Sequence, residues 1–231
     1  MENTTKPRKT VSATQMEALF YFLKSRNIKH YDVQCELADH IANAIEQTWE
    51  RNPDISFADA LAIEEEKFGG KFGFMKIMLK RQAALRKRYR KMFRGYFFSF
   101  FKLPQLIGVV AFGYAVFRLL LWWPKAYILL FVVSIFTMIL RVRSLSRRYA
   151  TNPHGHHWLM EEMIYARDGF GYMVFFINLA WQMWRDEYPP TLLLFESILY
   201  TLLMLYVYVK LIIIPNRAEA YLKEVYPEYG K

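Results

Sequence analysis

Two ionisable residues lie inside long apolar stretches, where an isolated charge is costly. Arg118 falls near the end of the run 103–121, and Glu196 falls inside the run 191–214. A charge at the bilayer centre costs about 3 kcal/mol on insertion scales, so pairing is the default expectation. Counting at about 1.5 Å per residue places both within roughly 10 Å of the same membrane face. We therefore predict an interhelical ion pair between Arg118 and Glu196.

Two amide side chains accompany this predicted pair. Asn178 and Gln182 lie in the apolar stretch 170–184 and could donate hydrogen bonds to neighbouring helices. An alternative is an ion or proton path, which would make the chain a small transporter or channel subunit. The structural interpretation is favoured because a path requires more than one ionisable pair.

The segment from His154 to Glu162 carries the residue types of a metal site. His157 and Glu161 are four apart, so on a helix they share a face and could join His154 or His156 around zinc. No HExxH or CxxC pattern and no distant second ligand set accompanies them. We favour a polar loop followed by an interfacial helix, and predict no metal and no other cofactor. A membrane metalloprotein remains the alternative.

His40 beside Asp39 suggests acid–base chemistry. His40 also precedes Ile41 within an apolar helical pattern, and neither a nucleophile nor a second base is evident nearby. A partly buried structural histidine is the favoured interpretation. The sequence predicts no catalytic residue and a protein that is not an enzyme.

A basic run is the strongest charge feature. Residues 71–102 contain 11 Lys and Arg and no acid, whereas residues 1–70 have a net charge of −4. The run adjoins the first apolar stretch, where each cation gains about 1 kcal/mol from anionic headgroups. We predict lipid contact rather than nucleic acid binding, since no nucleic-acid-binding motif accompanies the run. The residues assigned to anionic-lipid contact are Arg86, Lys87, Arg88, Arg90, Lys91 and Arg94.

The composition requires these features to be positioned by membrane helices. The chain of 231 residues is 54% hydrophobic and 18% aromatic, yet its mean hydropathy is only +0.03 because the charges lie outside a few apolar runs. A single cysteine, Cys35, excludes an intrachain disulfide scaffold. We predict four transmembrane helices, at 103–121, 126–140, 170–184 and 191–214, with Pro215 ending the last.

The distribution of Lys and Arg predicts the topology. The loop 141–168 carries five such residues, and the tail after Pro215 carries three. The short turns 122–125 and 185–190 carry one each. Positively charged flanks stay on the cytoplasmic side, so we predict that both termini are cytoplasmic in an inner (plasma) membrane.

The segment before the membrane helices is typical of short amphipathic helices. Ser12 with Gln15, and Ser56 with Asp59, predict capping boxes at two helix starts. Apolar residues recur every four positions from Val33 to Trp49, and Gly69-Gly70 stops the third helix. A fourth helix begins near Phe72. The predicted core includes Leu19, Phe20, Leu37, Ile41, Leu61 and Phe68.

Short motifs in this segment resemble a known family. Glu36–Ile41 (ELADHI), Ser56–Leu61 (SFADAL) and Phe68-Gly69 are similar to the small all-helical HAAS-type domain, over about residues 14–80. That resemblance implies a signalling or interaction module of bacterial membrane proteins, often associated with PadR-like transcription regulators. It implies no reaction.

Together these patterns predict an all-α polytopic membrane protein. Its expected parts are a disordered N-terminus (1–11), a cytoplasmic helical domain (12–80), a basic juxtamembrane helix (81–102), a four-helix transmembrane domain (103–214) and a cytoplasmic tail (215–231). The predicted function is a non-enzymatic regulatory or accessory protein. Its cytoplasmic helices and spans would bind a protein partner or a larger membrane complex.

Overall fold

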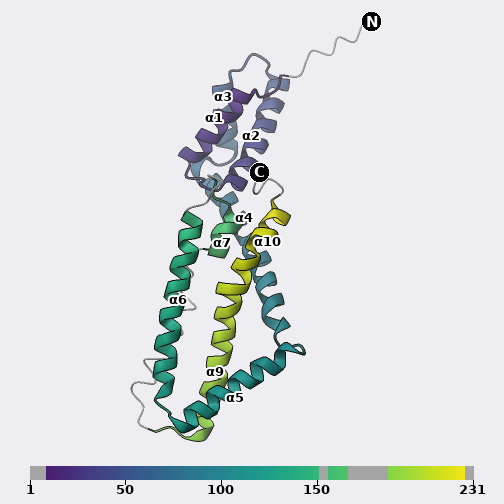
Figure 1. Cartoon of the computed structure of the whole chain (residues 1–231). Helices are drawn as coiled ribbons and strands as arrows, with labels where there is room; N and C mark the ends of the chain where they lie inside the picture. The colour runs from purple at the N-terminus through teal and green to yellow at the C-terminus, as the bar shows by residue number, and fades with distance from the viewer. Residues whose placement is uncertain (1–8, 151–155, 166–186, 227–231) are drawn as a thin grey trace. The chain divides into compact units, whose positions relative to one another are not determined.

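The chain is helical throughout the part that the structure describes. The computed structural model describes residues 9–150, 156–165 and 187–226, apart from the side chain of Lys71. No strand occurs among these residues, so the predicted all-α class is confirmed (Figure 1). The helices are α1 (Ala13–Ser25), α2 (Tyr31–Arg51), α3 (Phe57–Lys67), α4 (Gly70–Ser99), α5 (Gln105–Trp122), α6 (Ala126–Ala150), α7 (Leu159–Tyr165), α9 (Pro190–Tyr208), the π-helix η1 (Val209–Ile213) and α10 (Ile214–Val225).

The chain divides into two compact units. The first contains residues 1–86 and 155–159, and the second contains residues 87–154 and 160–231. Helix α4 continues unbroken from the first unit into the second. No loop therefore marks the domain boundary that the sequence places at residue 80.

Capping serines start two helices of the first unit, and of the two predicted capping boxes the one at Ser12 has both of its bonds. The Ser12 hydroxyl accepts a hydrogen bond from the Gln15 amide at 3.3 Å, and the Gln15 side chain accepts one from the Ser12 amide at 2.9 Å. The Ser56 hydroxyl accepts a hydrogen bond from the Asp59 amide at 3.1 Å. These bonds satisfy amides that the first turn of a helix leaves without an intrahelical acceptor.

Helix α2 supplies the main apolar face of the first unit. The predicted spacing of four is confirmed, because each of its members is at most 2% exposed: Val33, Leu37, Ile41, Ile45 and Trp49. Leu19 on α1 is fully buried against this core. The other predicted core residues, Phe20, Leu61 and Phe68, are half-buried.

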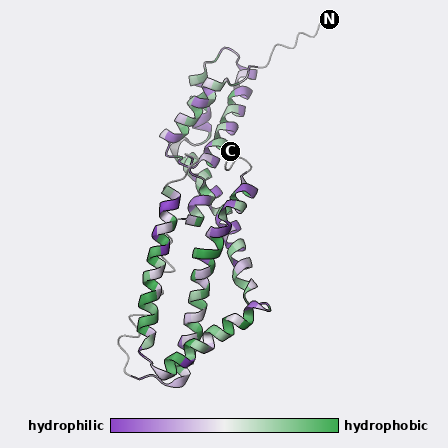
Figure 2. Ribbon diagram, in the orientation of Figure 1, coloured by the Kyte–Doolittle hydropathy of each residue, from purple (hydrophilic) through white to green (hydrophobic). Residues whose placement is uncertain are grey.

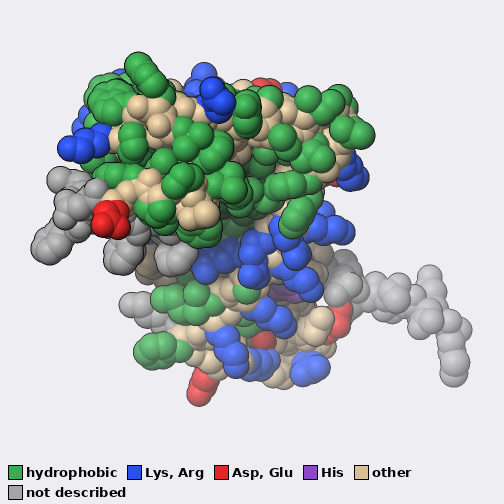
Figure 3. Space-filling view, turned by 90° about the horizontal axis from the view of Figure 1, so that it is seen from below, with side chains coloured by type: hydrophobic (Ala, Val, Ile, Leu, Met, Phe, Trp, Pro, Cys, Tyr) green, Lys and Arg blue, Asp and Glu red, His purple; other side chains and the backbone are tan. Residues whose placement is uncertain are grey.

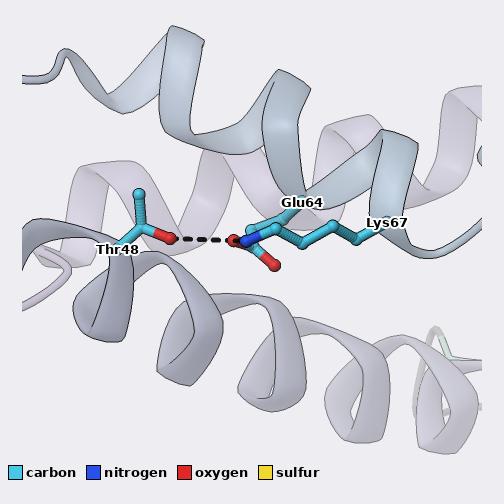
Figure 4. A network of polar contacts seen from close by, with 3 residues as sticks. All are labelled: Thr48, Glu64 and Lys67. Atoms are coloured by element: carbon cyan, nitrogen blue, oxygen red, sulfur yellow. Dashed lines mark hydrogen bonds and ion pairs between the residues drawn. The ribbon is translucent and has the colours of Figure 1, made fainter. Parts of the chain in front are cut away.

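A buried carboxylate joins α2 to α3. Glu64 is 4% exposed, and its Oε1 accepts a hydrogen bond from the Thr48 hydroxyl at 2.8 Å. The Lys67 ammonium donates to the same oxygen (Figure 4). A buried carboxylate is tolerated when it is paired and hydrogen-bonded, and this network meets both conditions.

Three glycines form the corner between α3 and α4. Gly69 and Gly70 have φ angles of 80° and 60°, a region that residues with a Cβ rarely adopt. A Cβ at Gly73 would lie 1.5 Å from the Phe68 carbonyl oxygen. The turn that stops α3 at the predicted glycine pair therefore also requires a glycine one turn further on.

The segment 156–159 is part of the first unit, although it lies between α6 and α9 in the sequence. The Tyr31 amide, at the start of α2, donates to the His157 carbonyl at 2.9 Å. In return, the Leu159 amide, at the start of α7, donates to the Asp32 carboxylate at 3.1 Å. The Tyr31 ring stacks on His156 with centroids 4.2 Å apart. The loop between two membrane helices is thus built into the helical N-terminal unit.

The second unit contains the membrane helices. Three helices in the described part of the chain are long and apolar enough to cross a membrane: Gln105–Trp122, Ala126–Ala150 and Pro190–Val225. Figure 2 shows the hydrophobic colour along α5, α6 and α9. Three of the four predicted spans fall on these helices. The predicted span 170–184 lies outside the described residues.

The outward faces of these helices are apolar, as contact with lipid requires. Large side chains such as Ile107, Phe136 and Phe195 are 63%, 61% and 62% exposed. Hydrophobic side chains cover much of the visible face in Figure 3. On the inner side, a Cβ at Gly113 of α5 would lie 3.2 Å from the Thr201 hydroxyl of α9. A small residue is needed for this close helix packing.

Pro215 does not end the last membrane helix, so that prediction was wrong. The helix changes to a π-helix over Val209–Ile213, where the Ile214 amide donates to the Val209 carbonyl, and α10 then continues to Val225. A proline is tolerated at the first turn of a helix, and the π-helix resets the hydrogen-bond pattern before it. The predicted tail therefore begins as buried helix, with Pro215, Ala218 and Leu222 packed inside.

Arg141 supplies the hydrogen bond that the proline removes. Pro215 has no amide hydrogen, so the Leu211 carbonyl, four residues earlier, has no α-helical donor. Arg141 Nε of α6 donates to this oxygen at 3.1 Å, and the same guanidinium donates to Asn216 Oδ1 at 3.3 Å. The sequence analysis counted Arg141 only among the cations of the loop 141–168, whereas in the fold it joins α6 to the end of the longest span.

Arg141 and Pro215 should therefore be energetically coupled. Arg141→Met should lower the free energy of unfolding by about 1.5–3 kcal/mol, because a charged hydrogen bond is lost and a carbonyl is left unsatisfied. Pro215→Ala restores an amide at that position, so Arg141→Met should cost at least about 0.5 kcal/mol less in that background. Unfolding in detergent measures all four proteins of the cycle, with the exposed Arg143→Met as control. Equal losses in both backgrounds would contradict the assignment.

Candidate functional site

Several polar side chains of the membrane helices α9 and α6 are buried. On α9, Glu196, Ser197 and Thr201 are 3%, 1% and 6% exposed. On α6, Tyr127 and Ser134 are 1% and 7% exposed. Polar side chains buried in a membrane interior are candidates for function by default. We call these residues, together with Tyr200 of α9, the α6–α9 polar cluster.

Most hydroxyls of the α6–α9 polar cluster bond to the membrane helices themselves. The Ser134 and Tyr200 hydroxyls are 2.8 Å apart, and Ser134 also donates to the Leu130 carbonyl at 2.7 Å. The Tyr127 hydroxyl lies 3.5 Å from the Glu196 carbonyl oxygen, and Thr201 donates to the Ser197 carbonyl at 2.7 Å. Two of these bonds, those of Tyr127 with the Glu196 carbonyl and of Ser134 with Tyr200, join α6 to α9, and the other two lie within one helix.

The predicted ion pair between Arg118 and Glu196 is not formed. Arg118 is exposed on α5, Glu196 is buried on α9, and Arg118 makes no ion pair among the described residues. The pair is absent because Arg118 lies on the wrong face of α5. Val116 and Leu120 are buried, and Arg118 lies two residues from each, on about the opposite side of the helix. The depth estimate ignored this rotation.

The other two predicted intramembrane polar residues, Asn178 and Gln182, lie outside the described residues. The basic run is described apart from the side chain of Lys71. All six predicted lipid-contact residues are exposed on α4: Arg86, Lys87, Arg88, Arg90, Lys91 and Arg94. Phe93 instead packs on Tyr206 of α9, with ring centroids 5.1 Å apart. The aromatic side chain thus contacts the membrane helices while the cations remain exposed.

The histidine-rich segment has a structural role where it is described. His156 and His157 contribute a ring stack and a carbonyl acceptor to the start of α2. Among the described residues, no three His, Cys, Asp or Glu side chains are close enough together to hold a metal ion. His154 lies outside the described residues.

His40 differs from its expected environment. The sequence placed it as a partly buried structural residue, but it is exposed on α2. Ile41 is buried, so the adjacent position turns about 100° away from the core.

The first turns of α4 expose one apolar face, which the sequence analysis did not single out. Met75 and Leu79 are 40% and 53% exposed, and Phe72 is 87% exposed. Phe74 is the residue that is fully buried, against Phe22 and Phe68. The spacing 72, 75 and 79 could have indicated this second apolar face, because those positions share one side of a helix that excludes residue 74.

Comparison with known proteins gives no relative. No family model, no curated protein and no solved structure matches the chain.

Arg118 and Glu196 should behave as independent residues. Arg118→Leu should change the free energy of unfolding by less than about 0.5 kcal/mol, because the side chain is exposed. Combined with Glu196→Leu, its effect should add to within about 0.5 kcal/mol. Thermal unfolding in detergent of both single variants and the double variant measures this. A coupling energy above about 1 kcal/mol would mean that the two side chains do contact each other.

Proposed function

We propose that this chain is a non-enzymatic membrane regulatory or accessory protein that binds a protein partner through its N-terminal helical unit. The observation that carries this proposal is an exposed apolar face at the start of α4. Phe72, Met75 and Leu79 recur at helical spacing and are all exposed. We call these three residues the α4 stripe. Exposed apolar residues gathered on one face indicate an interaction site, whereas scattered ones need no explanation.

The charges beside the α4 stripe favour an acidic partner. Lys76 and Lys80 are exposed within the same turns, and residues 71–102 contain no acidic residue. An amphipathic helix with an apolar face and flanking Asp or Glu would bury the stripe and meet these cations. The resemblance to the HAAS-type domain supports the same role, since that domain is regarded as an interaction module.

The exposed cations of α4 also support contact with lipid. They precede the first candidate span, where anionic headgroups would attract them. The distribution of Lys and Arg favours an inner-membrane protein with both termini in the cytoplasm. In this proposal the N-terminal unit meets its partner at the cytoplasmic surface of the membrane.

Transport is the second candidate function, and the burial of Glu196 favours it. Burying a carboxylate that is only 3% exposed inside a candidate span costs free energy, and such residues commonly have a function. The internal hydrogen bonds of the α6–α9 polar cluster support a structural purpose instead. Under the regulatory proposal, Glu196→Gln leaves partner binding intact.

Partner binding should depend on the α4 stripe. A photo-reactive amino acid at Phe72 should cross-link one protein in native membranes, whereas the same amino acid at Tyr21 of α1, which is 73% exposed, should not. In a chain labelled at Phe72, Leu79→Ser should reduce the cross-linked product at least about tenfold, because burying apolar area drives such contacts. Equal cross-linking from Phe72 and Tyr21 would argue against the stripe as the binding site.

Topology can be tested with single cysteines in a Cys35→Ser background. Cysteines in the turns 122–125 and 187–189 should react with an impermeant thiol reagent added outside the cell, because those turns carry few cations. A cysteine at His156 should react only after lysis. Labelling of His156→Cys from outside would overturn the proposed orientation.

A further inference from the structure

A groove with one apolar end and one polar end runs along the second unit. It lies between the last turns of α4, the start of α5 and the continuous helix α9–η1–α10, and its volume is about 910 Å³. Ligand sites in proteins commonly have volumes of about 300–1,000 Å³. This volume holds a headgroup and the first part of an acyl chain.

The apolar end of the groove is lined by membrane side chains. Phe100 of α4 and Tyr208 of α9 meet edge to face with ring centroids 6.0 Å apart, and Ile212 and Ile213 continue the lining. Gly95, one residue before Tyr96 on α4, leaves open space in the groove, because a Cβ at that position would meet no heavy atom within 4 Å. An acyl chain would find apolar walls at the end near Phe100.

The polar end carries one cation and one anion. Arg217 and Glu224 both line the groove from α10, and both are exposed. The Arg217 guanidinium carbon lies 5.2 Å from the centre of the Tyr96 ring. This cation–π contact holds the guanidinium at the groove wall. Neither charge takes part in an ion pair within the described part of the chain. The two residues are seven apart on one helix, which separates their Cα atoms by about 10 Å along the axis.

We propose that this groove binds a zwitterionic phospholipid with a primary amine, of the phosphatidylethanolamine class. The Arg217 guanidinium binds the phosphate, the Glu224 carboxylate binds the ammonium, and one acyl chain lies along Phe100 and Ile212. An arginine fork suits phosphate oxygens. A carboxylate accepts hydrogen bonds from a primary ammonium, which a quaternary choline cannot donate.

The balance of charge in the groove is the reason for this choice of headgroup. A purely anionic lipid would leave Glu224 facing like charge, whereas a zwitterionic headgroup meets both side chains with opposite charge. The site is separate from the exposed cations of residues 86–94, which form no part of its lining. It also does not depend on the α4 stripe or on partner binding.

Native mass spectrometry of the full chain, released from detergent, tests the site. Phosphatidylethanolamine, phosphatidylcholine and phosphatidylglycerol with identical acyl chains are each added at equal concentration. The expected result is one retained phosphatidylethanolamine, at an occupancy at least about fivefold above the other two lipids. Equal retention of all three lipids, or preferred retention of phosphatidylglycerol, would overturn the proposal.

Variants locate the binding within the groove. Gly95→Leu fills open space in the groove beside Tyr96 and should reduce retention at least tenfold, whereas Gly108→Leu, which also meets no atom within 4 Å but lies outside the groove, should not. Leucine favours a helix more than glycine does, so both variants should keep the fold, as circular dichroism will show. Unchanged retention by a folded Gly95→Leu variant would contradict the site.

The two charges have matched controls on the same helix. Arg217→Gln should weaken retention of all phospholipids, because every one of them carries the phosphate. Glu224→Gln should remove only the preference for the primary amine. Lys223→Gln and Glu219→Gln change charges that pair with each other outside the groove, and should have neither effect. If Lys223→Gln equals Arg217→Gln, the binding is unspecific attraction and the proposal fails.

Discussion

Inside a membrane, a backbone carbonyl without a donor costs several kcal/mol, because no water is present to replace the missing bond. Pro215 creates this problem at Leu211, within the longest apolar helix of the chain. The Arg141 guanidinium solves it by donating to the Leu211 carbonyl from α6, just after the helix has changed to the π-helix Val209–Ile213. The interaction converts a helix-ending residue into a joint between two membrane helices.

Much of the second unit depends on that joint. Since the helix continues through Pro215, α10 exists, and it presents Arg217 and Glu224 to the groove whose apolar end is lined from η1. Nearer the start of α9, the α6–α9 polar cluster joins the same two helices through Ser134 and Tyr200. Two polar contacts thus fix α6 to α9–α10 at separate levels, and apolar packing fills the space between them.

Periodicity and length predicted the helices well, whereas side-chain direction and contacts between distant segments escaped prediction. The capped starts at Ser12 and Ser56 and the buried face of α2 follow from local patterns that need no tertiary information. Arg118 shows the limit, because residue counts gave an estimate of its depth but did not consider which face of α5 it occupies. The hydrogen bonds of Arg141 and Asp32 span 70 and 127 positions in the sequence, and no local pattern indicates them.

The continuity of the helix through Pro215 is tested most directly by hydrogen exchange of backbone amides in the full chain, in lipid nanodiscs. The account predicts slow exchange from Val209 through Leu222, with faster exchange over Arg217–Leu222 when Arg141 is replaced by Met, since the joint is then lost. Arg143→Met, which removes an exposed arginine of the same helix, should leave the exchange unchanged. Rapid exchange beyond Asn216 in the unaltered protein would show that the helix ends at the proline, and would contradict the account.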